Sequence, residues 1–249
     1  MADAPVPRDP FAPLRAATPA RVGLGRAGQG LPTAPMLAFQ LAHARARDAV
    51  HAALDVEALA ARIEGPVLRV ASAAADRAAY LADPGLGRRL DDATPGLPHG
   101  DWDLAIVAAD GLSATAVQAH AAPVIAVLQS RLMGWRIAPV VIARQGRVAI
   151  GDPIGEALGA RLVVVLIGER PGLSAADSLG AYITFDPRPG RLDSERNCVS
   201  NIRSPGGLAP GEAAETIAWL LGEARRLGFT GVDLKDRQVA GEETGPRLS

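Results

Sequence analysis

Apolar residues recur every three to four positions between residues 33 and 54, which is the spacing of one helix face. Thr33 is a residue type that caps helix N-termini, and Pro35 fits a first helical turn. We therefore expect a helix that begins at Thr33 and runs to about residue 54. The residues on or near its apolar face are Leu37, Leu41, Ala44, Val50 and Leu54.

Short β-branched runs alternate with helical stretches beyond residue 64, a pattern typical of a parallel sheet with crossover helices. The expected strands are residues 67–71, 104–108, 140–143, 162–167 and 182–185. The runs at 104–108 and 162–167 contain no alternating polar residues, which indicates central strands covered on both faces. The fold class that we expect is α/β, with a Rossmann-like, mostly parallel sheet and flanking helices.

Helices are expected between these strands, at residues 76–90, 114–133, 154–158 and 212–227. The Pro-Gly pair at 84–85 should interrupt the first of them, and Pro123 should kink the second. The Gln-Gly pair at 145–146 predicts a tight turn, so residues 147–150 are expected to form an antiparallel edge ribbon. Asp152, which precedes a proline, should lie at the start of the following helix.

Proline is frequent in the first 32 residues, where apolar periodicity is weak. The prolines are Pro5, Pro7, Pro10, Pro13, Pro19 and Pro32. Such a segment favours extended chain over a folded unit. We therefore divide the sequence into an extended arm at residues 1–32, a helical N-terminal segment at 33–63 and an α/β domain at 64–249.

The composition is that of a globular chain, with 249 residues, 48% of them hydrophobic, and a formal net charge of −1. This charge provides no overall field to attract nucleic acid or an anionic membrane, so we expect neither as a partner. No stretch approaches the ~20 apolar residues of a membrane-spanning helix, and the start lacks signal-peptide features. A single cysteine, Cys198, excludes an intramolecular disulfide and fits a cytoplasmic location.

Two of the expected central strands end in polar residues and glycines, where open parallel sheets bind ligands. These endings are the DGLS sequence at residues 110–113 and the GERPG sequence at residues 168–172. Glu169 offers a carboxylate that can accept hydrogen bonds from amide donors. The alternative interpretation is an ordinary turn in which Glu169 pairs with an arginine.

Other motifs give little support for an independent catalytic centre. Residues 23–28 match the G-x-G-x-x-G dinucleotide fingerprint, but no buried strand precedes them and Asp48 falls in an expected helix. No histidine lies near Cys198 in the sequence, and the four histidines lack zinc-site spacing, so we expect neither a Cys-His nucleophile nor a metal site. This pattern favours a binding or auxiliary subunit over a self-sufficient enzyme.

Several segments resemble one family in the same order along the chain. Besides DGLS at 110–113 and GERPG at 168–172, they include the sequence CVSNI at residues 198–202 and HARARDAV at residues 43–50. In these segments the chain resembles the small subunit, or light chain, of ethanolamine ammonia-lyase.

The resemblance implies an adenosylcobalamin-dependent radical deamination of ethanolamine to acetaldehyde and ammonia. It implies a large subunit that binds ethanolamine and carries the catalytic residues, with several large–small pairs in a hetero-oligomer. The small subunit would cover cobalamin at the interface. The family's cobalamin contacts fall on Val148, Glu169 and Cys198 of this sequence, which makes residues 64–249 the cobalamin-contacting domain.

Two other functions stay open on the sequence alone. A stand-alone nucleotide-binding enzyme would bind nucleotide without a partner. A non-catalytic interaction module would form the complex but give no deamination. The family also works inside bacterial microcompartments, so enclosure there is an alternative to a location free in the cytoplasm.

Overall fold

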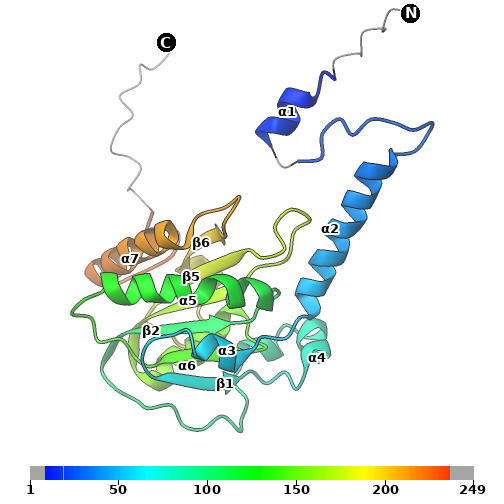
Figure 1. Cartoon of the computed structure of the whole chain (residues 1–249). Helices are drawn as coiled ribbons and strands as arrows, with labels where there is room; N and C mark the ends of the chain where they lie inside the picture. Colours follow the sequence, from blue (N-terminus) through cyan, green and yellow to red (C-terminus); the bar gives the residue numbers. More distant parts are fainter. Residues whose placement is uncertain (1–8, 19, 236–249) are drawn as a thin grey trace, which may run out of the picture.

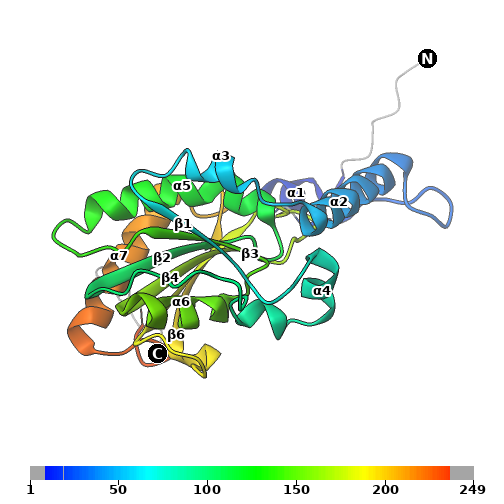
Figure 2. The ribbon, with the colours of Figure 1, turned by 90° about the horizontal axis from the view of Figure 1, so that it is seen from below.

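The computed structural model describes residues 9–18 and 20–235, and its body has three layers (Figures 1 and 2). A six-stranded sheet lies between helices α5 and α7 on one face and helix α6 on the other. The strands are β1 (Val67–Ala71), β2 (Trp102–Ala109), β3 (Val140–Arg144), β4 (Ala160–Gly168), β5 (Leu179–Phe185) and β6 (Arg196–Ile202). The helices are α1 (Ala12–Ala17), α2 (Thr33–His51), α3 (Val56–Ala60), α4 (Arg77–Ala82), α5 (Ala114–Arg131), α6 (Gly151–Leu158) and α7 (Pro210–Leu227).

The sheet has the strand order β1-β3-β2-β4-β5-β6. The first four strands in this order are parallel, whereas β5 pairs antiparallel with both β4 and β6. The α/β class, the mostly parallel sheet and all five predicted strands are confirmed, and the fifth of these strands, β5, runs antiparallel to both of its neighbours. Parallel pairing needs a crossover of a dozen or more residues, usually a helix, and the short loop between β4 and β5 contains none.

Strands β2 and β4 form the centre of the molecule, as their unbroken apolar runs predict. In β4, Val163, Val165 and Ile167 pack under α6. The intervening residues Leu162 and Val164 pack under α5 and α7. Burial of such a side chain stabilises the fold by about 1.5–3 kcal/mol, so the two apolar layers fix the sheet firmly.

Two local predictions around the sheet have different outcomes. The interruption at 84–85 is confirmed, because α4 ends at Ala82 and a short 3₁₀ helix, η1 (Leu86–Arg88), follows. The antiparallel edge ribbon at 147–150 is wrong: residues Val148–Ile150 form a 3₁₀ helix, η2, that leads directly into α6. Strand β3 already pairs with β1 and β2, so it has no free edge for such a ribbon.

The N-terminal part stands apart from the sheet. Helix α2 begins at the predicted Thr33, but the N-cap position belongs to Pro32, and α2 ends at His51 before α3 starts. The arm is not extended throughout, because α1 lies within it. Pro5, Pro7, Pro19 and the last residues of the predicted domain, 236–249, lie outside the described residues.

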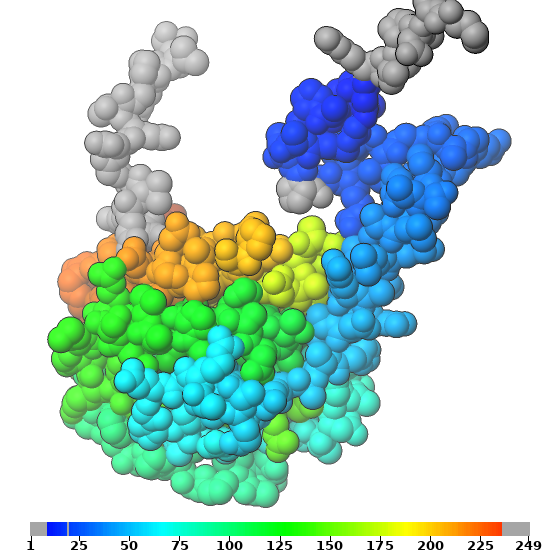
Figure 3. All heavy atoms as spheres, in the orientation of Figure 1, coloured from blue at the N-terminus to red at the C-terminus, as the bar shows by residue number. Residues whose placement is uncertain are grey.

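Helix α2 projects away from the body and leaves most of its surface uncovered (Figures 1 and 3). Ala49 is its one buried residue. Large apolar side chains are exposed along it, namely Met36, Leu37, Phe39 and Leu41. Within the described chain, no helix is long and apolar enough to span a membrane.

Candidate functional site

The carboxyl ends of β2 and β4 are neighbours, so the two predicted polar segments meet at one edge of the sheet. The backbone N–H of Leu112 donates to the carbonyl of Gly168 (2.9 Å). Gly111 has a φ of +55°, and a Cβ there would lie 2.3 Å from the same carbonyl oxygen. The close crossing therefore requires glycine at 111.

Asp110 is buried beneath this crossing and holds the turn at residues 145–146 against the end of β2. Its carboxylate accepts hydrogen bonds from the backbone N–H groups of Gln145 (3.0 Å) and Gly146 (3.1 Å). Burial raises the pKa of Asp110, while these hydrogen bonds and nearby Arg77 oppose the shift. Asp110 thus ties the end of β2 to the turn that precedes Val148, and it is not presented to a ligand.

Glu169 follows β4 and is only half-buried. Its carboxylate accepts hydrogen bonds from the hydroxyls of Ser178 and Ser200, both at 2.5 Å, and from the backbone N–H of Asn201 at 3.2 Å. Within the described residues it forms no ion pair with arginine, so that alternative is wrong. Gly180 makes room for it, because a Cβ at 180 would lie 2.9 Å from Glu169 Oε1.

Cys198 lies on β6 directly opposite Tyr182 of β5, and its residue is exposed. Partial burial of the thiol raises the pKa of Cys198, and the negative charge of Glu169 raises it further. A hydrogen bond with Tyr182 lowers the Cys198 pKa and offsets part of this shift. The thiol is therefore protonated near neutral pH and is not activated as a nucleophile.

Val148, Glu169 and Cys198 line two depressions that share part of their wall. One, of about 310 Å³, is lined by Val148 and Cys198, and the other, of about 420 Å³, by Val148 and Glu169. Arg147 and Tyr182 line both. The structure therefore brings the three predicted residues onto one surface, although they come from η2, the end of β4, and β6.

A buried ion pair joins β6 to α6, the helix that directly follows η2. Arg196 of β6 donates to both carboxylate oxygens of Asp152 in α6, each at 2.7 Å, and to Thr184 Oγ1 at 2.7 Å. The side chains of Arg196 and Asp152 are each only 2% exposed. Asp152 follows Val148 by four residues and Arg196 precedes Cys198 by two. The ion pair therefore fixes the distance between Val148 and Cys198, which line the same depression. Sequence analysis missed it, since nothing in the residue pattern links these distant positions.

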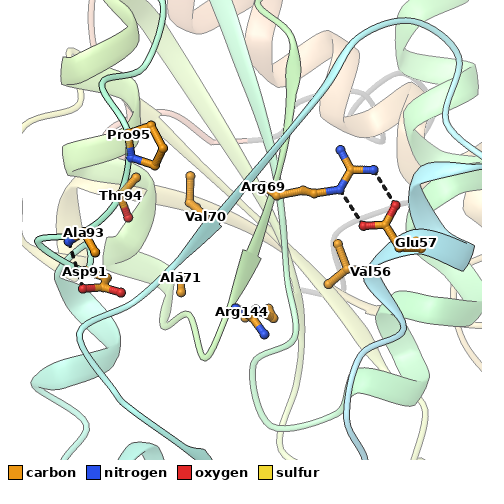
Figure 4. A pocket seen from close by; sticks show the side chains of 10 residues that line it. All are labelled: Val56, Glu57, Arg69, Val70, Ala71, Asp91, Ala93, Thr94, Pro95 and Arg144. Atoms are coloured by element: carbon orange, nitrogen blue, oxygen red, sulfur yellow. Dashed lines mark hydrogen bonds and ion pairs between the residues drawn. The ribbon is translucent and has the colours of Figure 1, made fainter.

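A third depression, of about 340 Å³, lies along β1, away from these residues (Figure 4). Arg69 reaches from β1 to Glu57, and its Nε and Nη2 donate to the two carboxylate oxygens at 2.7 and 2.6 Å. This pairing neutralises both charges. None of the three predicted residues lines this depression.

The glycine motif at residues 23–28 does not have the structural context of a dinucleotide-binding site. The glycines at 23, 25 and 28 have positive φ in the loop before α2, and the described residues that precede them, 9–18 and 20–22, form no strand. Asp48 lies within exposed α2 rather than at a strand end, so the dinucleotide fingerprint is not formed. In residues 9–18 and 20–235, no three His, Cys, Asp or Glu side chains are grouped to hold a metal ion.

Comparison with known proteins identifies the same family that the sequence segments resemble. The family model of the ethanolamine ammonia-lyase light chain matches residues 8–235. Proteins named ethanolamine ammonia-lyase small subunit are similar over nearly the whole chain. The one from Bradyrhizobium diazoefficiens is 54% identical, over 96% of this chain and 95% of its own. The one from Xanthomonas campestris pv. campestris is 52% identical, over 98% of this chain and 94% of its own. The one from Azotobacter vinelandii is 51% identical, over 97% of this chain and 95% of its own. The chain therefore belongs to the ethanolamine ammonia-lyase light chain family.

Proposed function

We propose that this chain forms one wall of an adenosylcobalamin site in ethanolamine ammonia-lyase, and that a large subunit binds ethanolamine and carries the catalytic residues. The observation that carries the proposal is the convergence of Val148, Glu169 and Cys198 on two adjoining depressions. Bound cobalamin supplies the radical chemistry that converts ethanolamine to acetaldehyde and ammonia.

The residues present fit a corrinoid with neutral amide side chains. A carboxylate offers about four lone-pair positions, and Glu169 uses three of them within the chain. One remains to accept a hydrogen bond from a corrin amide. Val148 and Cys198 offer small apolar contacts beside Glu169. Cys198 lies on β6, which pairs with β5, and Val148 lies in η2, which leads directly into α6, so both positions are held rigidly.

The chain covers the cofactor rather than enclosing it. The volumes of the two depressions, about 310 and 420 Å³, lie at the low end of the ~300–1,000 Å³ typical of enclosing ligand pockets. A corrinoid is much larger than a typical small ligand. A second chain must therefore supply the opposite wall.

Helix α2 supports assembly with the large subunit. Leu37 and Leu41, which are 58% and 52% exposed, lie one turn apart, and exposed apolar surface of this kind marks interaction sites. We propose that α2 packs against the large subunit and that several such pairs form a hetero-oligomer. We propose that the complex is free in the cytoplasm; the alternative is a bacterial microcompartment, which fractionation of a shell-producing cell would reveal.

Co-expression of both subunits tests the proposal. On addition of adenosylcobalamin and ethanolamine, the complex should release ammonia and give the resonance signal of a cobalt(II) radical pair. Complex formation without deamination would instead identify an interaction module. Nucleotide binding by the purified chain alone would favour a stand-alone nucleotide-binding enzyme.

A further inference from the structure

An arginine without an anionic partner among residues 9–18 and 20–235 lies where the two depressions adjoin. Arg147 lines both of them. Its Nε is buried without a hydrogen-bond partner, and no carboxylate of the described chain lies within ion-pair distance of its guanidinium. The neighbouring Arg196, by contrast, forms an ion pair in which both terminal nitrogens donate to Asp152. A cation left unpaired at a ligand surface is available for an anion that the chain does not itself supply.

The Arg147 side chain is held in place before any ligand binds. Its guanidinium lies 4.4 Å from the centre of the Tyr80 ring, and Arg77 lies 4.7 Å from the same ring. Tyr80 is fully buried, and its hydroxyl donates to the carbonyl of Gly146 (3.0 Å). Burial raises the pKa of Tyr80 to about 12, so the ring stays neutral.

Gly87 permits this stack. A Cβ at 87 would lie 2.7 Å from Arg147 Cγ and 2.9 Å from Tyr80 Cε2. The backbone N–H of Arg147 also donates to the carbonyl of Gly87 (2.7 Å). Because packing already restricts the arginine, binding an anion costs little additional side-chain entropy.

The surroundings of Arg147 are electropositive. Arg88 lines the first depression and Arg170 the second, and both are exposed and without an ion pair in the described part of the chain. Two carboxylates line these depressions: Asp193 lies 3.6 Å from Arg196, and Glu169 keeps its charge, so one carboxylate faces three arginines that have no ion pair in the described chain. The local charge therefore differs from the net −1 of the whole chain.

We infer that Arg147 binds a phosphodiester group of the ligand. Guanidinium binds phosphate oxygens in a planar, two-point geometry, which a stacked arginine presents without rearrangement. The inference rests on the proposed function: in cobalamin, the anionic group is the phosphodiester of the nucleotide loop, whereas the corrin amides are neutral. Arg147 thus discriminates complete cobalamin from corrinoids that lack the nucleotide.

The test compares two ligands on the assembled complex. Spectrophotometric titration gives the Kd of adenosylcobalamin and of adenosylcobinamide, which lacks the phosphodiester, for the wild type and Arg147→Met. The substitution should weaken adenosylcobalamin binding by roughly 10- to 100-fold and change adenosylcobinamide binding by less than about threefold. Arg147→Lys should retain part of the lost affinity, and Arg131→Met, which changes an exposed arginine at the end of α5, serves as the matched control.

Equal losses for both ligands would overturn the inference, as would loss of assembly in gel filtration, which would assign Arg147 to a carboxylate of the large subunit. If adenosylcobinamide binds too weakly to titrate, salt dependence decides. The affinity of the wild type for adenosylcobalamin must then fall more steeply with KCl than that of Arg147→Met. A wild-type complex that binds neither corrinoid refutes the proposed function itself, whereas unchanged binding by Arg147→Met refutes this inference alone.

Discussion

Tyr182 and Cys198 face each other across β5 and β6, and their side chains influence each other's protonation. Burial raises the pKa of Tyr182, and the neighbouring thiol raises it further. The Cys198 pKa is raised in turn, against the effect of the hydrogen bond with Tyr182. At the scale of the single residue, Tyr182 and Cys198 are therefore neutral groups beside the Glu169 carboxylate, which suits contacts with amides and hydrocarbon better than nucleophilic chemistry.

Alkylation of Cys198 tests this protonation state. Because only the thiolate reacts, the rate of iodoacetamide labelling should rise with a midpoint above the ordinary cysteine value of about 8.5. Tyr182→Phe removes a hydrogen bond that lowers the Cys198 pKa, so the midpoint should move higher still. Mass spectrometry follows the single cysteine, and the urea-unfolded chain is the control at each pH. A midpoint at or below that of the unfolded chain would contradict the description of this site.

The positions of Asp110 and Glu169 were predictable because both follow apolar runs that read as central strands, and such strands end at one sheet edge. The burial of Asp110 was not predictable, because its carboxylate points inward to accept hydrogen bonds from the turn at 145–146, which is distant in the sequence. No sequence pattern indicated that Tyr182 and Arg147 line the candidate site, because the residues around them are far away in the sequence.

At the scale of the element, the Asp152–Arg196 pair joins α6 to β6. Asp152→Ala leaves a buried guanidinium without its partner, so it should destabilise the fold by about 3–5 kcal/mol in urea unfolding. The double variant Asp152→Ala/Arg196→Met removes the isolated charge and should recover part of that loss. A double variant as unstable as the sum of the single substitutions would show that the two side chains are not coupled.

Helix α2 gives a second prediction at this scale. Leu37→Glu/Leu41→Glu places two charges on the exposed apolar face, so co-purification with the large subunit should be lost. The circular dichroism of the α/β body should change little, because these side chains lie outside its core. Gln40→Glu, at an exposed position of the same helix, should assemble normally. Normal assembly of the double variant would exclude this face from the interface.

Element prediction succeeded where the periodicity was strong and failed where tertiary pairing decided. Strand β6 was missed because its sequence, RNCVSNI, has few apolar residues and buries Arg196 through an ion pair. The antiparallel direction of β5 follows from the lack of a crossover helix after β4. The ribbon at 147–150 failed because strand order, which the sequence does not show, leaves β3 without an edge.

On the scale of the whole molecule, the chain resembles half of a binding site. One side of the β5–β6 region is covered by α7, and the opposite side carries Tyr182 and Cys198 at a partly open surface. Within the described residues, no three His, Cys, Asp or Glu side chains are grouped to hold a metal ion. The arrangement supports our proposal of a subunit that holds a cofactor against a partner.

The affinity of the assembled complex for cobalamin tests this account most directly. Glu169→Ala removes the carboxylate that we propose as the acceptor for a corrin amide, and Glu215→Ala, exposed on α7, is the matched control. In spectrophotometric titration, Glu169→Ala should weaken cobalamin binding by at least about tenfold with assembly unchanged, and Glu215→Ala should bind normally. Unchanged cobalamin affinity in the assembled Glu169→Ala complex would contradict the claim that this surface holds the cofactor.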